Sequence, residues 1–349
     1  MEPPSPQPLY QLALGFQESA VLATAIDSGM AATLHQHGPQ SDEDLTALLG
    51  LAPRGTGQFI AACCALGLLI RDADGRLRNS ELATHYLLPE RPGYLGGFIT
   101  FMYQREYPAW HHLHEVLRSD QPATWRHTAG RTTAFDPDDE EASEFIRALH
   151  PLAVAAGTAL AETVDLAANR ALLDIGGGSG GYAIGLCQAL PSLRVTVYDL
   201  PFVTEIARAN VQEVGLTDRI TCTPGNFLAD GGLPQGHDVA LLSNILHDWD
   251  PATNTHLLTE VHRSLEPGGL VIINELVLDN DRTGPAPAAL MGLNMVVETA
   301  GGRSYTQADH QALLTQVGFT GIQTQHLELP GVNIVITAKK PQPSQENTP

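Results

Sequence analysis

The sequence predicts an α/β protein in two parts: a doubly wound parallel sheet in the second half and a smaller helical domain before it. Three observations support this prediction. From Arg170 onward, short apolar strand segments alternate with helical segments, which is typical of a parallel sheet covered by helices on both faces. From Leu9 to about Leu88, the apolar residues have helical spacing. The chain of 349 residues is also longer than one core usually supports.

The N-terminal part is predicted to be an all-α, winged-helix domain over residues 9–140, after a disordered tail at 1–8. One of its helices begins at the N-cap residue Ser41 and ends at Gly50. Another helix follows, and then two short strands joined by a turn at Asp74-Gly75. Helices followed by a hairpin are the arrangement of a winged helix.

A linker helix and pocket wall is expected over 141–168, and the ligand-binding sheet over 169–339. The five expected parallel strands are "ALLDI", "LRVTVYD", "RITCTPG", "HDVALLSNIL" and "GLVIINELVL". Two more strands, "FTGIQTQHLEL" and "VNIVITAKK", follow with no helix between them. The sheet is therefore Rossmann-like with an antiparallel last strand. Residues 340–349 are expected to be a second disordered tail.

Composition limits the classes of partner. The formal net charge is −20, and so acidic a surface repels phosphate backbones and anionic lipid. Nucleic acid and membrane are therefore not expected as partners. The four cysteines show no metal-ligand spacing, and the segment "MEPPSPQPLY" has neither the basic nor the apolar region of a signal peptide. A cytoplasmic location is expected.

The stretch "LLDIGGGSGG" fits two glycine-loop patterns. Gly176, Gly178 and Gly181 match the G-x-G-x-x-G of a dinucleotide site. Asp174, with Gly176, Gly178 and Gly180, matches the D-x-G-x-G-x-G of an S-adenosylmethionine site. A carboxylate does not help a loop bind pyrophosphate, but it suits a ligand bearing an ammonium and a sulfonium.

Two further features bear on the choice of cofactor. Asp199, at the end of the second strand, can bind ribose hydroxyls in either cofactor and is neutral between them. Pro267-Gly268-Gly269 is expected as a turn directly before the fifth strand, which is typical of class I methyltransferases. Together with Asp174, this turn favours the methyl donor.

Several stretches carry a family resemblance: "LLDIGGGSG", "VYDLP", "GNFL", "LLSNILHDWD", "LEPGGLVIINE" and "GGRSYT". The region Leu172 to Thr306 resembles the plant-type (caffeate- and hydroxyindole-like) O-methyltransferase family and its bacterial small-molecule branch, and the winged-helix half matches as well. The resemblance implies a class I methyltransferase fold that binds S-adenosyl-L-methionine and an N-terminal domain that forms a homodimer. It also implies methyl transfer to a hydroxyl of a small aromatic acceptor in secondary metabolism.

The chemistry requires a base, because a phenol titrates near ~10. His247 follows the fourth strand and occupies the catalytic position of the family's "LHDW" stretch. Glu275 matches the family acid that orients this histidine, and we expect Glu275→Gln to cost less activity than His247→Ala because an acceptor remains. Asp248 is expected to support the loop rather than to contact the imidazole.

The second family acid corresponds to Ser304, which is a departure from the pattern. Glu298 can substitute for it from a nearby helix, and an ordinary capping or surface glutamate is the alternative.

The resemblance also implies the cofactor contacts. The backbone of Gly176, Gly178 and Gly180 approaches the methionine portion, and Asp199 with Leu200 lies at the ribose. Gly225, Asn226 and Phe227 lie near the adenine, and Ser243 replaces a lysine of plant members.

The acceptor pocket is assigned by family position to Met102, Tyr103, Trp110, Phe145, Leu149, Met291, Asn294 and Met295, any of which can instead be plain core. Arg105 and Arg303 can hold a substrate carboxylate, although exposed arginines are the simpler interpretation. No metal is expected, because "WHHLH" lacks accompanying acidic ligands.

Two rival functions remain at this point. A winged helix can belong to a DNA-binding regulator, but the candidate recognition segment "PRGTGQFIAACCALGLLI" carries only Arg54 as a charge. The nearer rival is C-methylation of a phenolic ring, which also needs a phenolate, so that His247 does not distinguish it from O-methylation.

The apolar character of the first helix favours an intertwined homodimer.

Overall fold

The computed structural model describes residues 3–124, 140–229, 231–327 and 333–342, and the chain divides into two compact units, Met1–Pro108 and Ala109–Pro349. Residues 125–139, at the end of the predicted N-terminal domain, and the outer residues of both predicted tails lie outside the described residues. None of the described helices is long and apolar enough to cross a membrane.

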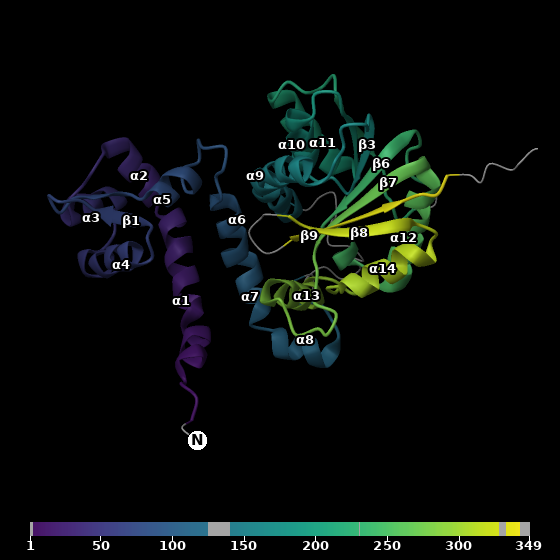
Figure 1. Cartoon of the computed structure of the whole chain (residues 1–349). Coiled ribbons are helices and arrows are strands. Elements are labelled where there is room, and N and C mark those ends of the chain that lie inside the picture. The colour runs from purple at the N-terminus through teal and green to yellow at the C-terminus, as the bar shows by residue number, and fades with distance from the viewer. Residues whose placement is uncertain (1–2, 125–139, 230, 328–332, 343–349) are drawn as a thin grey trace, which may run out of the picture. The chain divides into compact units, whose positions relative to one another are not determined.

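The first unit is mostly helical, as the apolar spacing predicts. Its elements in chain order are α1 (Gln7–Asp27), α2 (Met30–His37), α3 (Asp42–Leu49), α4 (Pro53–Ala65), β1 (Leu69–Arg71), β2 (Leu77–Asn79), α5 (Glu81–Tyr86), α6 (Gly96–Phe101), the π-helix η1 (Met102–Glu106) and α7 (Tyr107–Trp110), which crosses into the second unit (Figure 1).

The expected winged-helix features of this unit are confirmed. Ser41 caps α3, because its hydroxyl accepts the backbone N–H of Asp44, and Gly50 ends the helix in the left-handed conformation. β1 and β2 pair antiparallel through the turn at Gly75. The buried side chains of these elements form one core, which includes Met30, Leu45, Ile60, Leu77 and Leu88.

The second unit holds a seven-stranded sheet and the helices that cover it. Its elements are α8 (Leu113–Ser119), α9 (Glu140–Thr163), β3 (Ala171–Ile175), α10 (Gly181–Ala189), β4 (Arg194–Asp199), α11 (Pro201–Glu213), β5 (Ile220–Pro224), β6 (His237–Ser243), the 3₁₀ turn η2 (Leu246–Asp248), α12 (Pro251–Ser264), β7 (Leu265–Leu276), α13 (Ala286–Glu298), α14 (Gln307–Gln316), β8 (Thr320–Leu327) and β9 (Asn333–Lys339).

The strand order of this sheet is β5-β4-β3-β6-β7-β9-β8. The first five strands in that order pair in parallel, while β9 pairs antiparallel with both β7 and β8. The predicted Rossmann-like sheet with an antiparallel ending is confirmed. The order reverses beside β3, because β4 lies on one side of it and β6 on the other. Ligands of doubly wound sheets bind outside the carboxyl ends of the strands at such a reversal.

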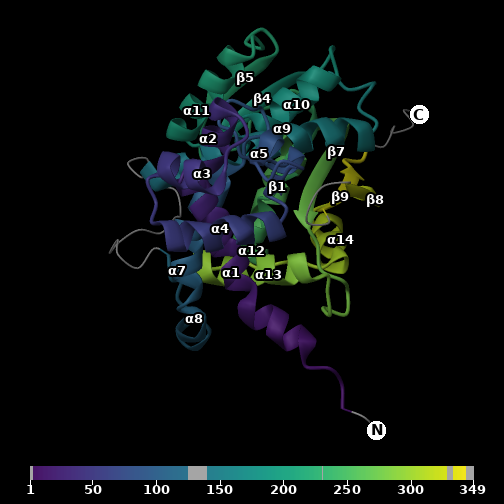
Figure 2. The same ribbon diagram turned by 90° about the vertical axis from the view of Figure 1, so that its left-hand side faces the viewer.

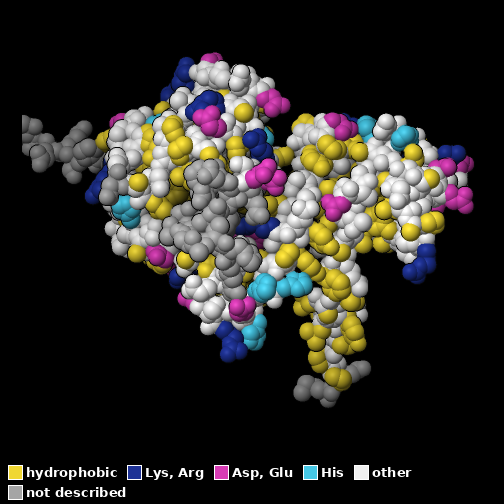
Figure 3. Space-filling model, turned by 180° about the vertical axis from the view of Figure 1, so that it is seen from behind, with side chains coloured by type: hydrophobic (Ala, Val, Ile, Leu, Met, Phe, Trp, Pro, Cys, Tyr) yellow, Lys and Arg dark blue, Asp and Glu magenta, His cyan; other side chains and the backbone are white. Residues whose placement is uncertain are grey.

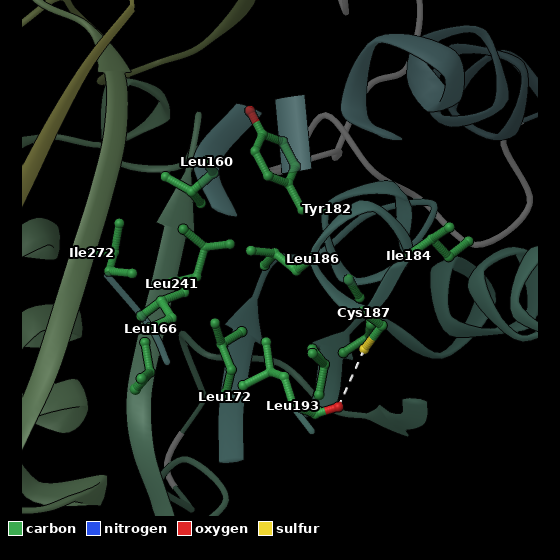
Figure 4. Packing of buried hydrophobic residues seen from close by; sticks show 14 of the residues in the cluster. Leu160, Leu166, Leu172, Tyr182, Ile184, Leu186, Cys187, Leu193, Leu241 and Ile272 are labelled. Carbon is green, nitrogen blue, oxygen red and sulfur yellow. Dashed lines mark hydrogen bonds between the residues drawn. The ribbon is translucent and has the colours of Figure 1, made fainter. Parts of the chain in front are cut away.

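Helices cover both faces of the sheet. On one face, side chains of α9, α10 and α11 pack on the central strands in a cluster that includes Leu160, Leu186 and Leu241 (Figure 4). On the other face, α12 and α14 pack in a second cluster, which includes Leu257 and Leu314. α14 also lies against β8 (Figures 1 and 2). The two covered faces hold the sheet rigid beneath the loops at its carboxyl edge.

The fifth parallel strand, β7, contains the residues Pro267-Gly268-Gly269, which the sequence predicts as a turn before the strand. β7 starts at Leu265, and its register with β6 shifts between His237 and Val239. Gly268 has a positive φ of 80°. The N–H of Gly268 donates to the carbonyl of Lys340, and the N–H of Lys340 donates to the carbonyl of Gly269. These hydrogen bonds join the segment to the chain after β9, so it continues the strand as a bulge rather than preceding it as a turn.

The sequence places the end of the N-terminal domain at residue 140, whereas the structure divides the chain at Pro108. The segment after that point belongs with the sheet unit because it packs on α13. The Trp110 indole N–H donates to the Asn294 side-chain oxygen at 2.7 Å, and the backbone N–H of Ala123 donates to the carbonyl of Val297.

Candidate active site

The glycine loop after β3 has a backbone that side chains would disturb. Gly176, Gly178 and Gly180 have φ of 68°, 55° and 74°, a left-handed region that glycine adopts readily. The N–H of Gly178 donates to Oδ2 of Asp199, at the end of β4, at 2.8 Å. Gly180 is the N-cap of α10. The loop is thus fixed at the carboxyl edge of the sheet, as predicted.

Asp174 gives this loop its chemical character. Its side chain is buried, and within the described residues its Oδ2 has no hydrogen-bond partner. A Cβ added at Gly177 would lie 2.7 Å from that oxygen, so the glycine leaves room beside it. Burial, together with the nearby charge of Asp199, raises the pKa of Asp174 to about 7. A buried carboxylate with a free oxygen fits a ligand that brings positive charge, as the ammonium and sulfonium of S-adenosylmethionine do.

The predicted ribose and adenine residues lie at the end of β4 and directly after β4 and β5, at the same edge. Oδ1 of Asp199 accepts the N–H of Leu200 at 2.7 Å. Burial raises the pKa of Asp199 to about 6, although its hydrogen bonds from Gly178 and Leu200 act in the opposite direction. The N–H of Gly225 donates to the carbonyl of Asp199, so the chain after β5 lies beside this carboxylate.

Asn226 and Phe227 come next. The Asn226 side-chain oxygen accepts the N–H of Leu228 at 2.9 Å, so its carbonyl is already used within its own turn. The ring of Phe227 meets Trp249 edge-on, with centroids 6.1 Å apart. Phe227 thus provides an apolar wall at this edge of the sheet.

Ser243, at the end of β6, belongs to a small polar network. The side-chain amide of Asn274 donates to the Ser243 hydroxyl at 3.0 Å and to the Tyr182 hydroxyl at 2.8 Å. Sequence reasoning did not select Tyr182 and Asn274. A tyrosine directly after the glycine loop and a polar residue inside an otherwise apolar strand were the available signals.

The candidate base and its partner lie at the ends of neighbouring strands. His247 is in η2, after β6, and Glu275 is near the end of β7. Oε2 of Glu275 lies 2.6 Å from Nδ1 of His247. Oε1 accepts the backbone N–H of Leu246 at 3.0 Å and that of His247 at 3.3 Å. One carboxylate thus fixes both the imidazole and the turn that carries it, so Nδ1 holds a hydrogen and Nε2 points elsewhere.

Asp248 contacts the imidazole, contrary to expectation. Its Oδ1 lies 3.6 Å from Nε2 of His247, because the tight 3₁₀ turn brings consecutive side chains together. Asn254 fixes the same turn from α12 by donating to the carbonyl of Leu246 at 2.8 Å. Sequence reasoning missed Asn254, and a polar residue on the apolar face of a helix was the signal that could have found it.

The pKa values in this cluster follow from burial and charge. Burial alone lowers the pKa of His247, but the carboxylates of Glu275 and Asp248 outweigh it and raise the pKa to about 9. At Glu275, burial raises the pKa of the carboxyl, but the charge of His247, the hydrogen bonds from His247 and the charge of His310 together outweigh burial and lower that pKa. Burial raises the pKa of Asp248 to about 6, with the imidazolium opposing the rise. At pH 7, the free enzyme therefore holds an imidazolium between two carboxylates.

The position of the second family acid is resolved in part. The Ser304 hydroxyl donates to the carbonyl of Ala288 in α13 at 2.6 Å, so it serves the backbone there. Glu298 is buried at the end of α13, a helix that packs against η2. In the part of the chain that the structure describes, the carboxylates within 4.0 Å of the His247 imidazole are those of Glu275 and Asp248. A catalytic role for Glu298 stays a prediction.

The predicted pocket residues fall into both units. In the second unit, Phe145 and Leu149 lie on α9, and Met291, Asn294 and Met295 lie on α13, where Asn294 accepts the Trp110 hydrogen bond. In the first unit, Met102 and Tyr103 lie in η1, and the Tyr103 ring stacks on Tyr107 with centroids 5.7 Å apart. Among the described residues, no three His, Cys, Asp or Glu side chains are placed to hold a metal ion.

The buried carboxylate of Asp174, near the end of β3 just before the glycine loop, and the histidine–glutamate pair at the same carboxyl edge of the sheet are the features of an S-adenosylmethionine-dependent methyltransferase. The family model of an O-methyltransferase domain matches residues 110–320, and that of an O-methyltransferase dimerisation domain matches residues 10–89. The chain therefore belongs to the O-methyltransferase family and is an S-adenosylmethionine-dependent O-methyltransferase, as its motifs predict.

Relatives extend over the whole chain. It is 37% identical to 3-hydroxy-5-methyl-1-naphthoate 3-O-methyltransferase of Streptomyces sahachiroi, covering 96% of this chain and 95% of the relative. It is 31% identical to the tetracenomycin polyketide synthesis 8-O-methyl transferase of Streptomyces glaucescens, covering 96% and 97%. The structure of human N-acetylserotonin methyltransferase in complex with S-adenosylmethionine superposes with a TM-score of 0.87 at 29% identity, covering 98% of this chain and 99% of that one. These names favour O-methylation over C-methylation.

Proposed function

We propose that this enzyme methylates a phenolic hydroxyl of a small, fused-ring aromatic acceptor of secondary metabolism, with His247 as the general base. The observation that carries the proposal is the 2.6 Å contact between Nδ1 of buried His247 and Oε2 of buried Glu275 at the sheet edge of the glycine loop. The two bacterial relatives support the acceptor class, because their names give a hydroxynaphthoate and a tetracenomycin polyketide.

When bound, S-adenosylmethionine supplies a methyl group already activated on a sulfonium. The residues of the chain must therefore align the acceptor and take its proton. With Nδ1 held by Glu275, the neutral imidazole accepts that proton at Nε2. The raised pKa suits this step. A phenol titrates near ~10, so its proton passes to a base with a raised pKa at a smaller cost in free energy than to an ordinary histidine.

The test is turnover of an acceptor panel with labelled S-adenosylmethionine. Hydroxynaphthoates, hydroxylated polycyclic aromatics and N-acetylserotonin span the acceptors named for the relatives. We expect turnover of a fused-ring phenol, with a product whose proton NMR spectrum shows an O-methyl resonance. An aryl C-methyl product, or no O-methyl product from any acceptor of the panel, would contradict the proposal.

We also propose that the enzyme works as a homodimer. The dimerisation domain spans most of the first unit, and α1 leaves large apolar side chains exposed over its first half (Figure 3). Leu9, Leu12 and Phe16 are 71%, 80% and 50% exposed and share one stripe of the helix. Burying such a stripe against a second copy removes it from water.

Light scattering tests the assembly. We expect wild-type enzyme to have twice the mass of the chain at micromolar concentration, and Leu12→Asp to weaken the dimer. The matched control is Leu117→Asp, which changes a similarly exposed leucine of α8 outside the dimerisation domain. A monomeric wild type would exclude the dimer.

The predicted absence of nucleic-acid and membrane partners and the cytoplasmic location remain proposals that rest on the acidic charge and the cysteine pattern.

A further inference from the structure

A part-buried polar contact holds the serine of the glycine loop. Ser179 lies between Gly178 and Gly180 and is 4% exposed. Its hydroxyl oxygen lies 2.9 Å from Nδ1 of His150, on α9. The side-chain nitrogen of Asn210, on α11, donates to the carbonyl of Ser179 at 2.9 Å and lies 3.3 Å from the same Nδ1. Side chains from two helices thus meet at the one loop residue that is not glycine.

The contacts define the protonation state of His150. The Asn210 amide nitrogen carries only donor hydrogens, and its hydrogen bond to the Ser179 carbonyl fixes which way the amide faces. Nδ1 of His150 faces this donor, so Nδ1 must be an acceptor and Nε2 must carry the hydrogen. The Ser179 hydroxyl therefore donates to Nδ1. Burial lowers the pKa of His150, with Glu213 opposing the change, which agrees with a neutral ring.

α9 is held against the start of α10 by close backbone packing. A Cβ added at Gly181 would lie 2.5 Å from Cβ of Ala153, and one at Gly157 would lie 2.5 Å from the carbonyl of Tyr182. Ala153 and Gly157 lie three and seven residues after His150, on the same face of α9. The helix therefore holds the imidazole firmly over the loop.

We propose that His150 is a positioning residue for the cofactor. By accepting the hydrogen bond of Ser179, it holds the loop in the conformation that receives the methionine portion of S-adenosylmethionine. This inference rests on the cofactor role of the loop and adds a group that does not itself touch the reacting atoms. Its loss makes the loop reorganise on binding, so cofactor affinity falls. The rate at saturating cofactor is expected to stay unchanged, because the hydrogen bonds of His247 and Glu275 do not involve the loop.

The test is a set of variants that keep or remove the acceptor. His150→Phe removes it, Ser179→Ala removes the donor, and His150→Asn places an amide oxygen near the position of Nδ1. We expect His150→Phe and Ser179→Ala each to raise the Kd for S-adenosylhomocysteine, measured by calorimetry, and the KM for S-adenosylmethionine by about 5- to 150-fold. We expect kcat to stay within about twofold of wild type, and His150→Asn to recover most of the affinity.

A double variant and a control separate this role from general packing. His150→Phe combined with Ser179→Ala is expected to bind no more weakly than the weaker of the two single variants, because both remove the same hydrogen bond. His326→Phe changes an exposed histidine of β8 and is expected to leave the Kd unchanged.

Other outcomes would overturn the inference. The first is an unchanged Kd for S-adenosylhomocysteine in Ser179→Ala, a result that can be used even if His150→Phe fails to fold. The second is additive effects on the Kd in the double variant. The third is a fall in kcat with an unchanged KM for S-adenosylmethionine. A wild type that does not bind S-adenosylhomocysteine would instead refute the cofactor assignment.

Discussion

Replacing Glu275 by glutamine should damage the enzyme more than the loss of one charge suggests. Oε1 accepts two backbone N–H groups of η2, while Oε2 takes the hydrogen on Nδ1 of His247. A glutamine has a single oxygen, and the two N–H groups require it. Its NH₂ group must then face Nδ1, which forces the imidazole to accept there and to carry its hydrogen on Nε2. The nitrogen that should take the phenol proton is then already protonated.

The structure therefore changes the expectation that Glu275→Gln costs less activity than His247→Ala because an acceptor remains. The equivalent change from carboxylate to amide in a Ser–His–Asp triad lowers kcat about 10⁴-fold by stabilising the wrong tautomer. If the amide turns the other way, two buried N–H groups lose their acceptor, which costs about 1–3 kcal/mol each. We expect Glu275→Gln to lower kcat by about 10³–10⁴-fold.

The assay is kcat with labelled S-adenosylmethionine at saturating acceptor, together with the Kd for S-adenosylhomocysteine. We expect the Kd to stay near wild type, because the glycine loop is held by other groups. The matched control is Glu266→Gln, the same change at an exposed position of β7. A Glu275→Gln enzyme that keeps more than a tenth of the wild-type kcat would refute the tautomer argument.

Three further predictions follow from the same geometry. Because the pKa of His247 is raised to about 9 and the base must be neutral, kcat/KM should rise with pH through about 9. Asp248→Asn removes a carboxylate 3.6 Å from Nε2 of His247 and should move the midpoint of this pH profile to lower pH. An unmoved midpoint would exclude His247 as the titrating group. Asp199→Ala should weaken S-adenosylhomocysteine binding by about 1.5–3 kcal/mol in calorimetry, and an unchanged Kd would remove Asp199 from the cofactor site. Glu298→Gln should lower kcat by less than Glu275→Gln does, and a wild-type kcat would leave Glu275 and Asp248 as the acids of the site.

Sequence periodicity predicted the parts of the fold that depend on repeated burial. The five parallel strands and the antiparallel ending follow from which segments are apolar and from the absence of a helix between the last two. Because parallel strands end at one edge of the sheet, the sequence also brought together Asp174, Asp199, His247 and Glu275.

Features that depend on side-chain conformation were not predictable in this way. No sequence pattern indicates that one Glu275 oxygen binds the His247 imidazole while the other accepts backbone N–H groups of η2. None indicates that Asp248 lies near Nε2 of His247. The bulged start of β7 was missed because its hydrogen bonds come from Lys340, more than seventy residues later. His150 was overlooked because its partner, Ser179, lies on a loop that packing of α9 against α10 brings to it.

In the proposed mechanism, His247 removes the acceptor proton. The measurement that tests it most directly is kcat for His247→Ala at saturating acceptor and cofactor, made together with the Kd for S-adenosylhomocysteine. We expect kcat to fall about 10²–10⁴-fold with an unchanged Kd, because the imidazole serves the acceptor rather than the methyl donor. A wild-type kcat with an acceptor of ordinary phenol pKa would exclude His247 as the base and assign the rate to alignment alone.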